Sequence, residues 1–172
     1  MELQAYHRTI KPELLKHKID NGEKPFLLDV REPEEYGDWH IAGSINIPLR
    51  TLVEGTFDTK IPKNKEIVTI CMHGIRSEKA MRILVELGYN ARVMEGGMVA
   101  WNSVYDIIRI RCNQQDVNVT QFRRVGKGCI SYIISSGKEA VVIDPTMDVD
   151  TYLKAAKAEK LQIVAVLDTH AQ

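Results

Sequence analysis

Between residues 10 and 105, short apolar runs alternate with segments of helical periodicity. The apolar runs 26–30, 67–70 and 91–94 have the length and composition of buried strands. Because helices separate these strands, their order predicts an α/β fold with a parallel sheet and helices on both faces. Ligands of such sheets bind beyond the carboxyl ends of the strands, and functional residues are expected there.

A lone cysteine, Cys71, follows the strand 67–70 and opens a loop of sequence CMHGIRS. Apolar spacing predicts a helix over 77–87, with Ser77 as its N-cap. The backbone N–H groups of residues 72–76 are then free to converge on the Cys71 sulfur. A helix N-terminus lowers a thiol pKa from its free value of about 8.5, so the sequence predicts a reactive thiolate.

The candidate catalytic residue is therefore Cys71, and the candidate substrate-binding loop comprises Met72, His73, Gly74, Ile75, Arg76 and Ser77. We expect the Arg76 guanidinium to attract an anionic substrate or to contact the loop. Gly74 is expected to adopt a positive φ, which larger residues adopt only at a cost. Two interpretations of His73 stay open, contact with the substrate and simple exposure to solvent. The loop as a whole is typical of a cradle for an anion.

Other polar and aromatic side chains near strand ends favour structural roles. Asp29 and Arg31 form a carboxylate and cation pair that commonly holds loops together, although Arg31 can also line the mouth of a pocket. His40 is expected to fix a turn through a hydrogen bond rather than to transfer protons. Trp39 and Trp101 are expected to be packing residues.

Beyond residue 106 the pattern changes to a strand meander followed by a strand-helix-strand unit. The expected strands are 117–122, 129–134, 140–145 and 163–167, and the expected helix is 150–160. We therefore divide the chain into a first domain, 1–110, and an incomplete second domain, 111–172. Its exposed sheet edges predict docking on the first domain, homodimerisation through the C-terminal segment, or poor order.

The charge and cysteine content of the chain exclude several classes of protein. Lys and Arg number 23 and Asp and Glu also number 23, so no net charge attracts nucleic acid or an anionic membrane. The three cysteines, Cys71, Cys112 and Cys129, do not form a disulfide framework and are typical of a reducing cytoplasm. Cys129 is expected in the core, whereas Cys112 is a bystander or a thiol that resolves a modified Cys71. Without a signal peptide or an apolar span, the chain is expected to be soluble and cytoplasmic.

Three ordered motifs in residues 10–105 resemble the rhodanese (sulfurtransferase) family. They are LLDVRE with EY and HIAGSINIP at 27–48, the Cys71 loop, and GY with EGGMVAW at 88–101. The resemblance implies a flavodoxin-like α/β sheet and a cofactor-free transfer of sulfane sulfur through a Cys71 persulfide. Thiosulfate or a low-molecular-weight persulfide would be the donor, and a thiol or cyanide the acceptor. Small sulfur-containing anions and thiols would thus be the partners.

Two alternative functions stay open beside the sulfurtransferase. The first is a sulfur-carrier or recruitment module that loads Cys71 and passes the sulfur to an attached domain or a partner. The second is a cysteine phosphatase, whose loop resembles Cys-x5-Arg. Here the spacing from Cys71 to Arg76 is Cys-x4-Arg, one residue shorter, and this favours sulfur because loop size selects the anion.

The second part of the chain resembles the opening of a metallo-β-lactamase-fold domain, nearest to the persulfide dioxygenase and glyoxalase II-like branch. The resemblance is carried by GCISY at 128–132, VIDP at 142–145 and VLDTH at 166–170. In that family the Thr-His pair opens an iron or zinc motif. Gln172 stands where the second histidine of the motif would be, so no metal site is expected in this chain. His170 would be a ligand only in a longer protein that completes the domain.

Overall fold

The computed structural model describes residues 8–56, 61–146 and 148–170. The chain divides into two compact units that meet between Val104 and Tyr105. This division falls before the predicted boundary at residue 110, because residues 105–110 form a strand that pairs within the second unit. No helix in the described ranges is long and apolar enough to cross a membrane.

The first unit contains a five-stranded sheet of order β1-β5-β4-β2-β3, in which all neighbouring strands are parallel. This confirms the predicted parallel α/β arrangement. Its elements are β1 (Thr9–Ile10), α1 (Pro12–Asp20), β2 (Phe26–Asp29), α2 (Pro33–Asp38), β3 (Ile45–Asn46), α3 (Leu49–Glu54), β4 (Ile67–Ile70), α4 (Ile75–Glu86), β5 (Ala91–Met94) and α5 (Gly97–Trp101).

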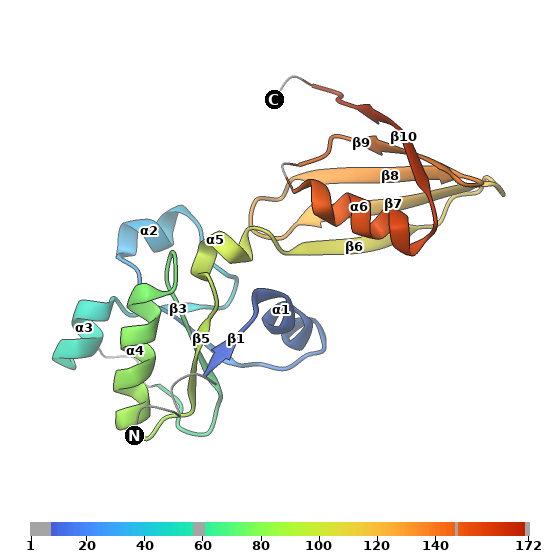
Figure 1. Ribbon diagram of the computed structural model, residues 1–172. Helices are drawn as coiled ribbons and strands as arrows, with labels where there is room; N and C mark the ends of the chain where they lie inside the picture. The colour runs from blue at the N-terminus through green and yellow to red at the C-terminus, as the bar shows by residue number, and fades with distance from the viewer. Residues whose placement is uncertain (1–7, 57–60, 147, 171–172) are drawn as a thin grey trace. The chain divides into compact units, whose positions relative to one another are not determined.

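The centre of this sheet is buried on both faces. All four residues of β4 are buried, as is typical of a central parallel strand. Leu52 of α3 and Met81 and Leu84 of α4 pack with β2, β4 and β5 into one core cluster. Figure 1 shows α3 and α4 on one side of the sheet and α1 on the other. The core thus fixes the carboxyl end of β4 and the start of α4 relative to each other.

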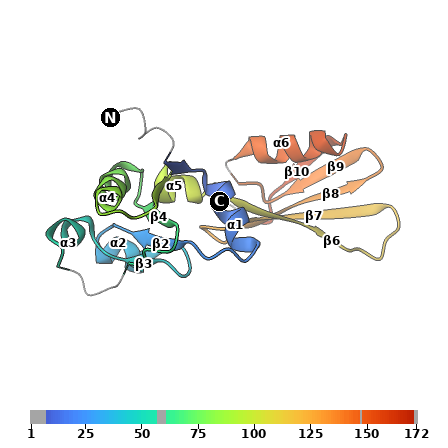
Figure 2. The same cartoon turned by 90° about the horizontal axis from the view of Figure 1, so that it is seen from below.

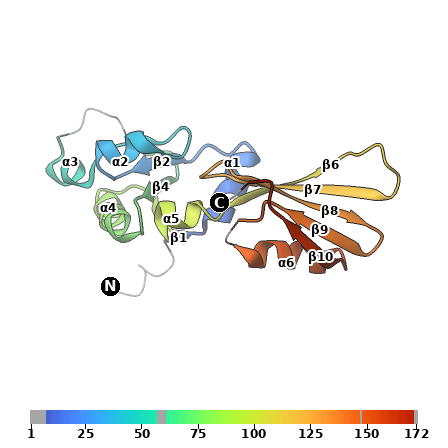
Figure 3. The same cartoon turned by 90° about the horizontal axis from the view of Figure 1, so that it is seen from above.

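The second unit contains another five-stranded sheet, of order β10-β9-β8-β7-β6. Neighbouring strands are antiparallel, except that β10 runs parallel to β9, so the sheet is mixed. Its elements are β6 (Tyr105–Ile110), β7 (Val117–Arg124), β8 (Ile130–Ser136), β9 (Glu139–Ile143), α6 (Val149–Ala158) and β10 (Gln162–Leu167). Figures 2 and 3 show α6 on one side of this sheet.

The two faces of the second sheet differ. Tyr152 of α6 packs against Phe122, and Ile133 and Val142 complete this core. Side chains alternate between faces along each strand, so the opposite face carries apolar residues that α6 does not cover. These are Ile108, Ile110, Ile130 and Leu167, which are 51%, 39%, 44% and 54% exposed.

The prediction that Cys129 lies in the core is wrong. Cys129 is exposed and precedes β8 rather than belonging to it. The Cys129 carbonyl oxygen accepts a hydrogen bond from the Arg124 N–H, which closes the turn between β7 and β8. Alternation of side chains begins only where strand pairing begins, at Ile130.

Candidate active site

Cys71 lies directly after the carboxyl end of β4. The neighbouring strand is held in register there, because the Val30 N–H donates to the Ile70 carbonyl oxygen at 2.8 Å. Cys71 is only 2% exposed, so its thiol lies inside the loop rather than on its surface. This is the position at which ligands bind in open parallel sheets.

Several donors converge on the Cys71 sulfur. The N–H of Gly74 donates to Sγ at 3.1 Å, and the N–H of Ser77 lies 3.4 Å from the same atom. The Ser77 hydroxyl is a further neighbour of Sγ at 3.4 Å. Burial alone raises the pKa of the Cys71 thiol, but the Ser77 hydroxyl and the N–H groups of Ser77, Gly74 and His73 outweigh it. The pKa of Cys71 is therefore lowered, in the direction that favours a thiolate.

Ser77 is not the N-cap of the following helix, contrary to the prediction. Gly74 occupies the N-cap with a φ of 105°, and α4 begins at Ile75. Ser77 is thus the third residue of the helix, and its N–H is one of the first-turn donors that have no partner within a helix. That donor is aimed at Sγ instead. The positive φ predicted for Gly74 is confirmed.

The first turn of α5 holds the loop from the other side. The N–H of Met98 donates to the Cys71 carbonyl oxygen at 2.8 Å, and that of Val99 donates to the Met72 carbonyl oxygen at 3.1 Å. A Cβ atom on Gly97 would lie 2.2 Å from the Cys71 carbonyl oxygen. Only glycine permits this approach, which explains the second glycine of the EGGMVAW motif.

Arg76 is bound to a carboxylate that the sequence reasoning did not connect with it. Its guanidinium donates to both carboxylate oxygens of Glu35 in α2, at 2.6 and 2.7 Å. The hydrogen bonds from Arg76 lower the pKa of Glu35, and those to Glu35 raise the pKa of Arg76. Glu35 belongs to a motif used for family resemblance, but no spacing rule links it to a residue 41 positions later.

Asp29 and Arg31 form a fully buried ion pair, with both side chains 0% exposed. Nε and Nη2 of Arg31 donate to the Asp29 carboxylate at 2.7 to 3.0 Å, and Nη2 also donates to the Trp39 carbonyl oxygen. The Trp39 ring lies 5.8 Å from the guanidinium carbon. This geometry is that of structural support. The burial of Arg31 favours this role over the alternative that it lines the mouth of a pocket.

The remaining predicted loop residues line the outside of the cradle. His73 is exposed, and its contribution to the sulfur comes from the backbone N–H. Ile75 is 71% exposed and so presents an apolar side chain beside the loop.

His40 stacks on Tyr36 and its Nδ1 lies 2.9 Å from the Tyr36 carbonyl oxygen, which agrees with a role in the turn. Trp101 is buried as a packing residue.

The second unit contributes no metal cluster in the part of the chain that the structure describes. His170 is exposed and lies 3.8 Å from a carboxylate oxygen of Asp144, whose oxygens accept hydrogen bonds from Thr169. A single histidine beside an engaged carboxylate does not fit an iron or zinc site. Gln172 lies outside the described residues. Cys112 is exposed in the connection between β6 and β7.

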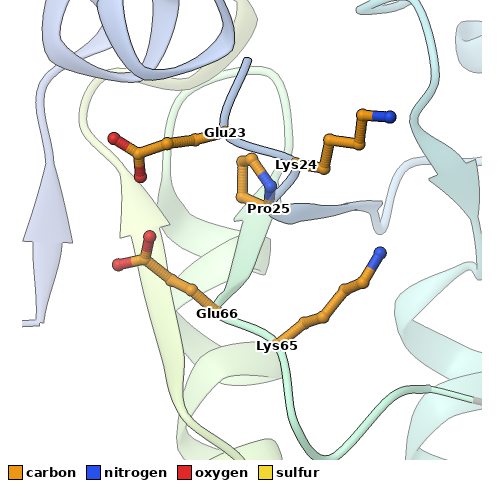
Figure 4. A pocket seen from close by; sticks show the side chains of 5 residues that line it. All are labelled: Glu23, Lys24, Pro25, Lys65 and Glu66. Atoms are coloured by element: carbon orange, nitrogen blue, oxygen red, sulfur yellow. The ribbon is translucent and has the colours of Figure 1, made fainter. Parts of the chain in front are cut away.

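One shallow pocket lies at the opposite end of β2 and β4 from Cys71 (Figure 4). It is lined by Glu23, Lys24, Pro25, Lys65 and Glu66. Both of its carboxylates are engaged, because Lys18 donates to each and Arg92 also pairs with Glu66. Since it adjoins the amino ends of these strands, the pocket is separate from the thiol chemistry.

The fold and the site define an α/β domain built around one buried, hydrogen-bonded thiol. Residues 11–104 match the family described as Rhodanese-like domain. The chain therefore belongs to the rhodanese-like domain family, and this match confirms the resemblance of the first unit. The match ends at Val104, where the first compact unit also ends.

Known relatives share this domain. The probable adenylyltransferase/sulfurtransferase MoeZ of Mycobacterium tuberculosis is 36% identical over 54% of this chain and 24% of its own length. The thiosulfate sulfurtransferase GlpE of Pseudomonas paraeruginosa is 30% identical over 57% of this chain and 86% of its own length. The solved structure of the BH2092 protein from Bacillus halodurans is 27% identical, covers 58% of this chain and 74% of that chain, and has a TM-score of 0.51.

These relatives support a sulfurtransferase function for the rhodanese-like unit. The chain spans about a quarter of the length of MoeZ, so the activity of that whole protein is not transferred to it. The family match lies within the first unit. The second unit is a mixed sheet with one helix.

Proposed function

We propose that this protein transfers sulfane sulfur through a persulfide on Cys71, from thiosulfate or a low-molecular-weight persulfide to a thiol or cyanide. The observation that carries the proposal is the convergence of the Gly74 and Ser77 donors on the buried Sγ. Such donors stabilise a sulfur anion without a metal or a general base.

The reaction has two displacement steps. In the first, the Cys71 thiolate attacks the outer sulfur of thiosulfate, a new S–S bond forms, and sulfite leaves with the electron pair of the broken bond. The enzyme then carries Cys–S–S⁻. In the second, cyanide or a thiolate attacks the terminal sulfur and forms thiocyanate or a new persulfide, and the Cys71 thiolate leaves with the electron pair of the broken S–S bond. The N–H groups of the loop can stabilise both the Cys71 thiolate and the Cys71 persulfide, since each anion carries its charge on sulfur.

Mass spectrometry of the intact protein tests this proposal directly. After incubation with thiosulfate, we expect a gain of one sulfur atom on Cys71 and its loss on addition of cyanide. The variant Cys71→Ala should neither gain sulfur nor produce thiocyanate. The double variant Cys112→Ala/Cys129→Ala is the matched control, because it removes the two exposed thiols and leaves Cys71. Thiocyanate production by Cys71→Ala at the wild-type rate would exclude the proposal.

We also propose that the second unit is the opening portion of a metallo-β-lactamase-like fold. Its mixed sheet with α6 on one face and apolar residues on the other supports this, because a sandwich needs a second layer over that face. On this proposal, the rhodanese-like unit acts as a sulfur carrier for the attached fold or its partner. Stoichiometric loading of Cys71 without steady-state turnover would distinguish a carrier from an enzyme.

We propose a second copy of the chain as the alternative occupant of this face, which would make the protein a homodimer. We also propose a reducing cytoplasm as its compartment. Ile108 and Leu167 are each about half exposed on this face. Such a surface suits a second copy, since the same patch on two chains is self-complementary about a two-fold axis. The cysteines are all free, in agreement with a reducing compartment.

A further inference from the structure

Glu35 and Arg76 form a bridge beside the Cys71 cradle. Arg76 is the second residue of α4 and directly precedes Ser77, which contacts Sγ. Its guanidinium and the Glu35 carboxylate are joined by two parallel hydrogen bonds and are 33% and 30% exposed. The pKa of Arg76 is raised, first by the hydrogen bonds with Glu35 and in smaller part by the Cys71 thiolate. Arg76 is thus the chain neighbour of a residue that contacts the thiol sulfur.

The bridge changes the net charge that an incoming sulfur donor meets beside Cys71. Arg76 would offer one positive charge to an incoming anion, but the Glu35 carboxylate cancels it. The other guanidinium at this edge of the sheet, that of Arg31, is cancelled by Asp29 in the same way. The thiolate is therefore stabilised by the N–H groups of Gly74 and Ser77, and neither of these two guanidinium groups adds uncompensated charge.

This arrangement affects sulfur donors unequally. Thiosulfate carries two negative charges, so its attraction to a free cation and its repulsion by a carboxylate are both about twice those of a singly charged donor. A persulfide of an uncharged thiol carries at most one charge. Cys71 can take sulfur from it by attack on the terminal sulfur of R–S–SH, with R–S⁻ as the leaving group and Cys71–S–SH as the product.

We propose that Glu35 is a specificity-determining residue, which pairs with Arg76 and thereby biases the Cys71 site toward persulfides of small thiols and against dianionic thiosulfate. The inference rests on the proposed sulfur transfer and names its preferred class of donor. Glu35 acts through Arg76, so its effect should appear in KM for the dianion more than in kcat.

The variant Glu35→Gln tests this proposal without disrupting the N-terminal capping box of α2. Glu35 accepts a hydrogen bond from the Glu32 N–H in a capping box, and glutamine serves in the same motif. For thiosulfate we expect kcat/KM to rise roughly tenfold, mainly through KM, because no carboxylate then offsets the positive charge of Arg76. For 2-hydroxyethyl persulfide we expect a change of less than about threefold. The gain with thiosulfate should shrink between about 50 mM and about 500 mM salt.

Two further variants separate the effect of the Glu35–Arg76 ion pair from that of any nearby negative charge. Glu34→Gln removes the same charge from an exposed neighbour in the same helix, and it should leave the ratio of the two donors unchanged. The double variant Glu35→Gln/Arg76→Gln removes both charges and should return the ratio toward that of the wild type.

The outcomes separate the inference from the proposed function. If the wild type gains sulfur on Cys71 but Glu35→Gln leaves the donor ratio unchanged, or lowers both rates equally, the specificity role is overturned. An equal shift in Glu34→Gln would also overturn it, since any nearby charge would then suffice. If the wild type gains no sulfur from either donor, the proposed function itself fails.

Discussion

The N–H of Met98 donates to the carbonyl oxygen of Cys71 at 2.8 Å, so the start of α5 holds the residue that carries the chemistry. The N–H of Val99 likewise donates to the Met72 carbonyl oxygen at 3.1 Å, so two successive residues of the loop are tied to α5. The last motif of the first unit therefore contributes to the site through its backbone.

Gly97→Ala should destabilise the first unit. The new Cβ would lie 2.2 Å from the Cys71 carbonyl oxygen, and φ at this position is 59°. Left-handed strain and overpacking together should cost about 2–4 kcal/mol in the free energy of unfolding, measured by urea denaturation. Gly22→Ala is the matched control, with φ of 84° and open space around its Cβ, and should cost only about 1–2 kcal/mol. Equal losses in the two variants would contradict the packing argument.

Ser77→Ala should shift the pH dependence of persulfide formation to higher pH. The Ser77 hydroxyl lowers the pKa of Cys71, so its removal raises that pKa and reduces the thiolate fraction at neutral pH. We expect the rate near pH 7 to fall roughly tenfold, as for loss of a hydrogen bond to a charged group. The rate should recover at alkaline pH, where the thiol ionises in both proteins. A uniform loss at all pH values would contradict this role.

Asp29→Asn should destabilise the first unit more than a surface change would. The Arg31 guanidinium is fully buried and would lose its charged partner. Breaking a buried ion pair from one side typically costs about 3–5 kcal/mol, which chemical denaturation would reveal. The double variant Asp29→Leu/Arg31→Met should recover part of that loss, because it leaves no buried charge. Wild-type stability of Asp29→Asn would contradict a structural role for the pair.

Ile108→Lys should weaken the proposed homodimer. Ile108 is 51% exposed on the face of the second sheet that α6 does not cover. A charge there would have to be desolvated in a paired interface, so sedimentation velocity should show a shift toward monomer at micromolar concentration. Ile107→Lys is the matched control, since Ile107 is 54% exposed but points to the other face of β6. A wild-type chain that stays monomeric would contradict the dimer.

The sequence predicted the first unit well because its signals are local. The strand 67–70 and the helix beginning at Pro12 appear in the structure as β4 and α1. Apolar runs and proline at a helix start act through their immediate neighbours, which the sequence displays. The start of α4 was predicted two residues late, because Gly74 rather than Ser77 takes the N-cap. Cys129 was misplaced for the same kind of reason, since it still belongs to the turn and the strand begins one residue later than predicted, at Ile130.

The sequence by itself determined the parallel α/β unit, the position of Cys71 after its strand, and the family to which residues 11–104 belong. Only the tertiary structure decided the partners of the site. It placed Glu35 on Arg76, Met98 on the Cys71 carbonyl, and Arg31 in the interior. Periodicity reports what lies within a few residues of a position. Charge cancellation and backbone contacts depend instead on segments that only folding brings together.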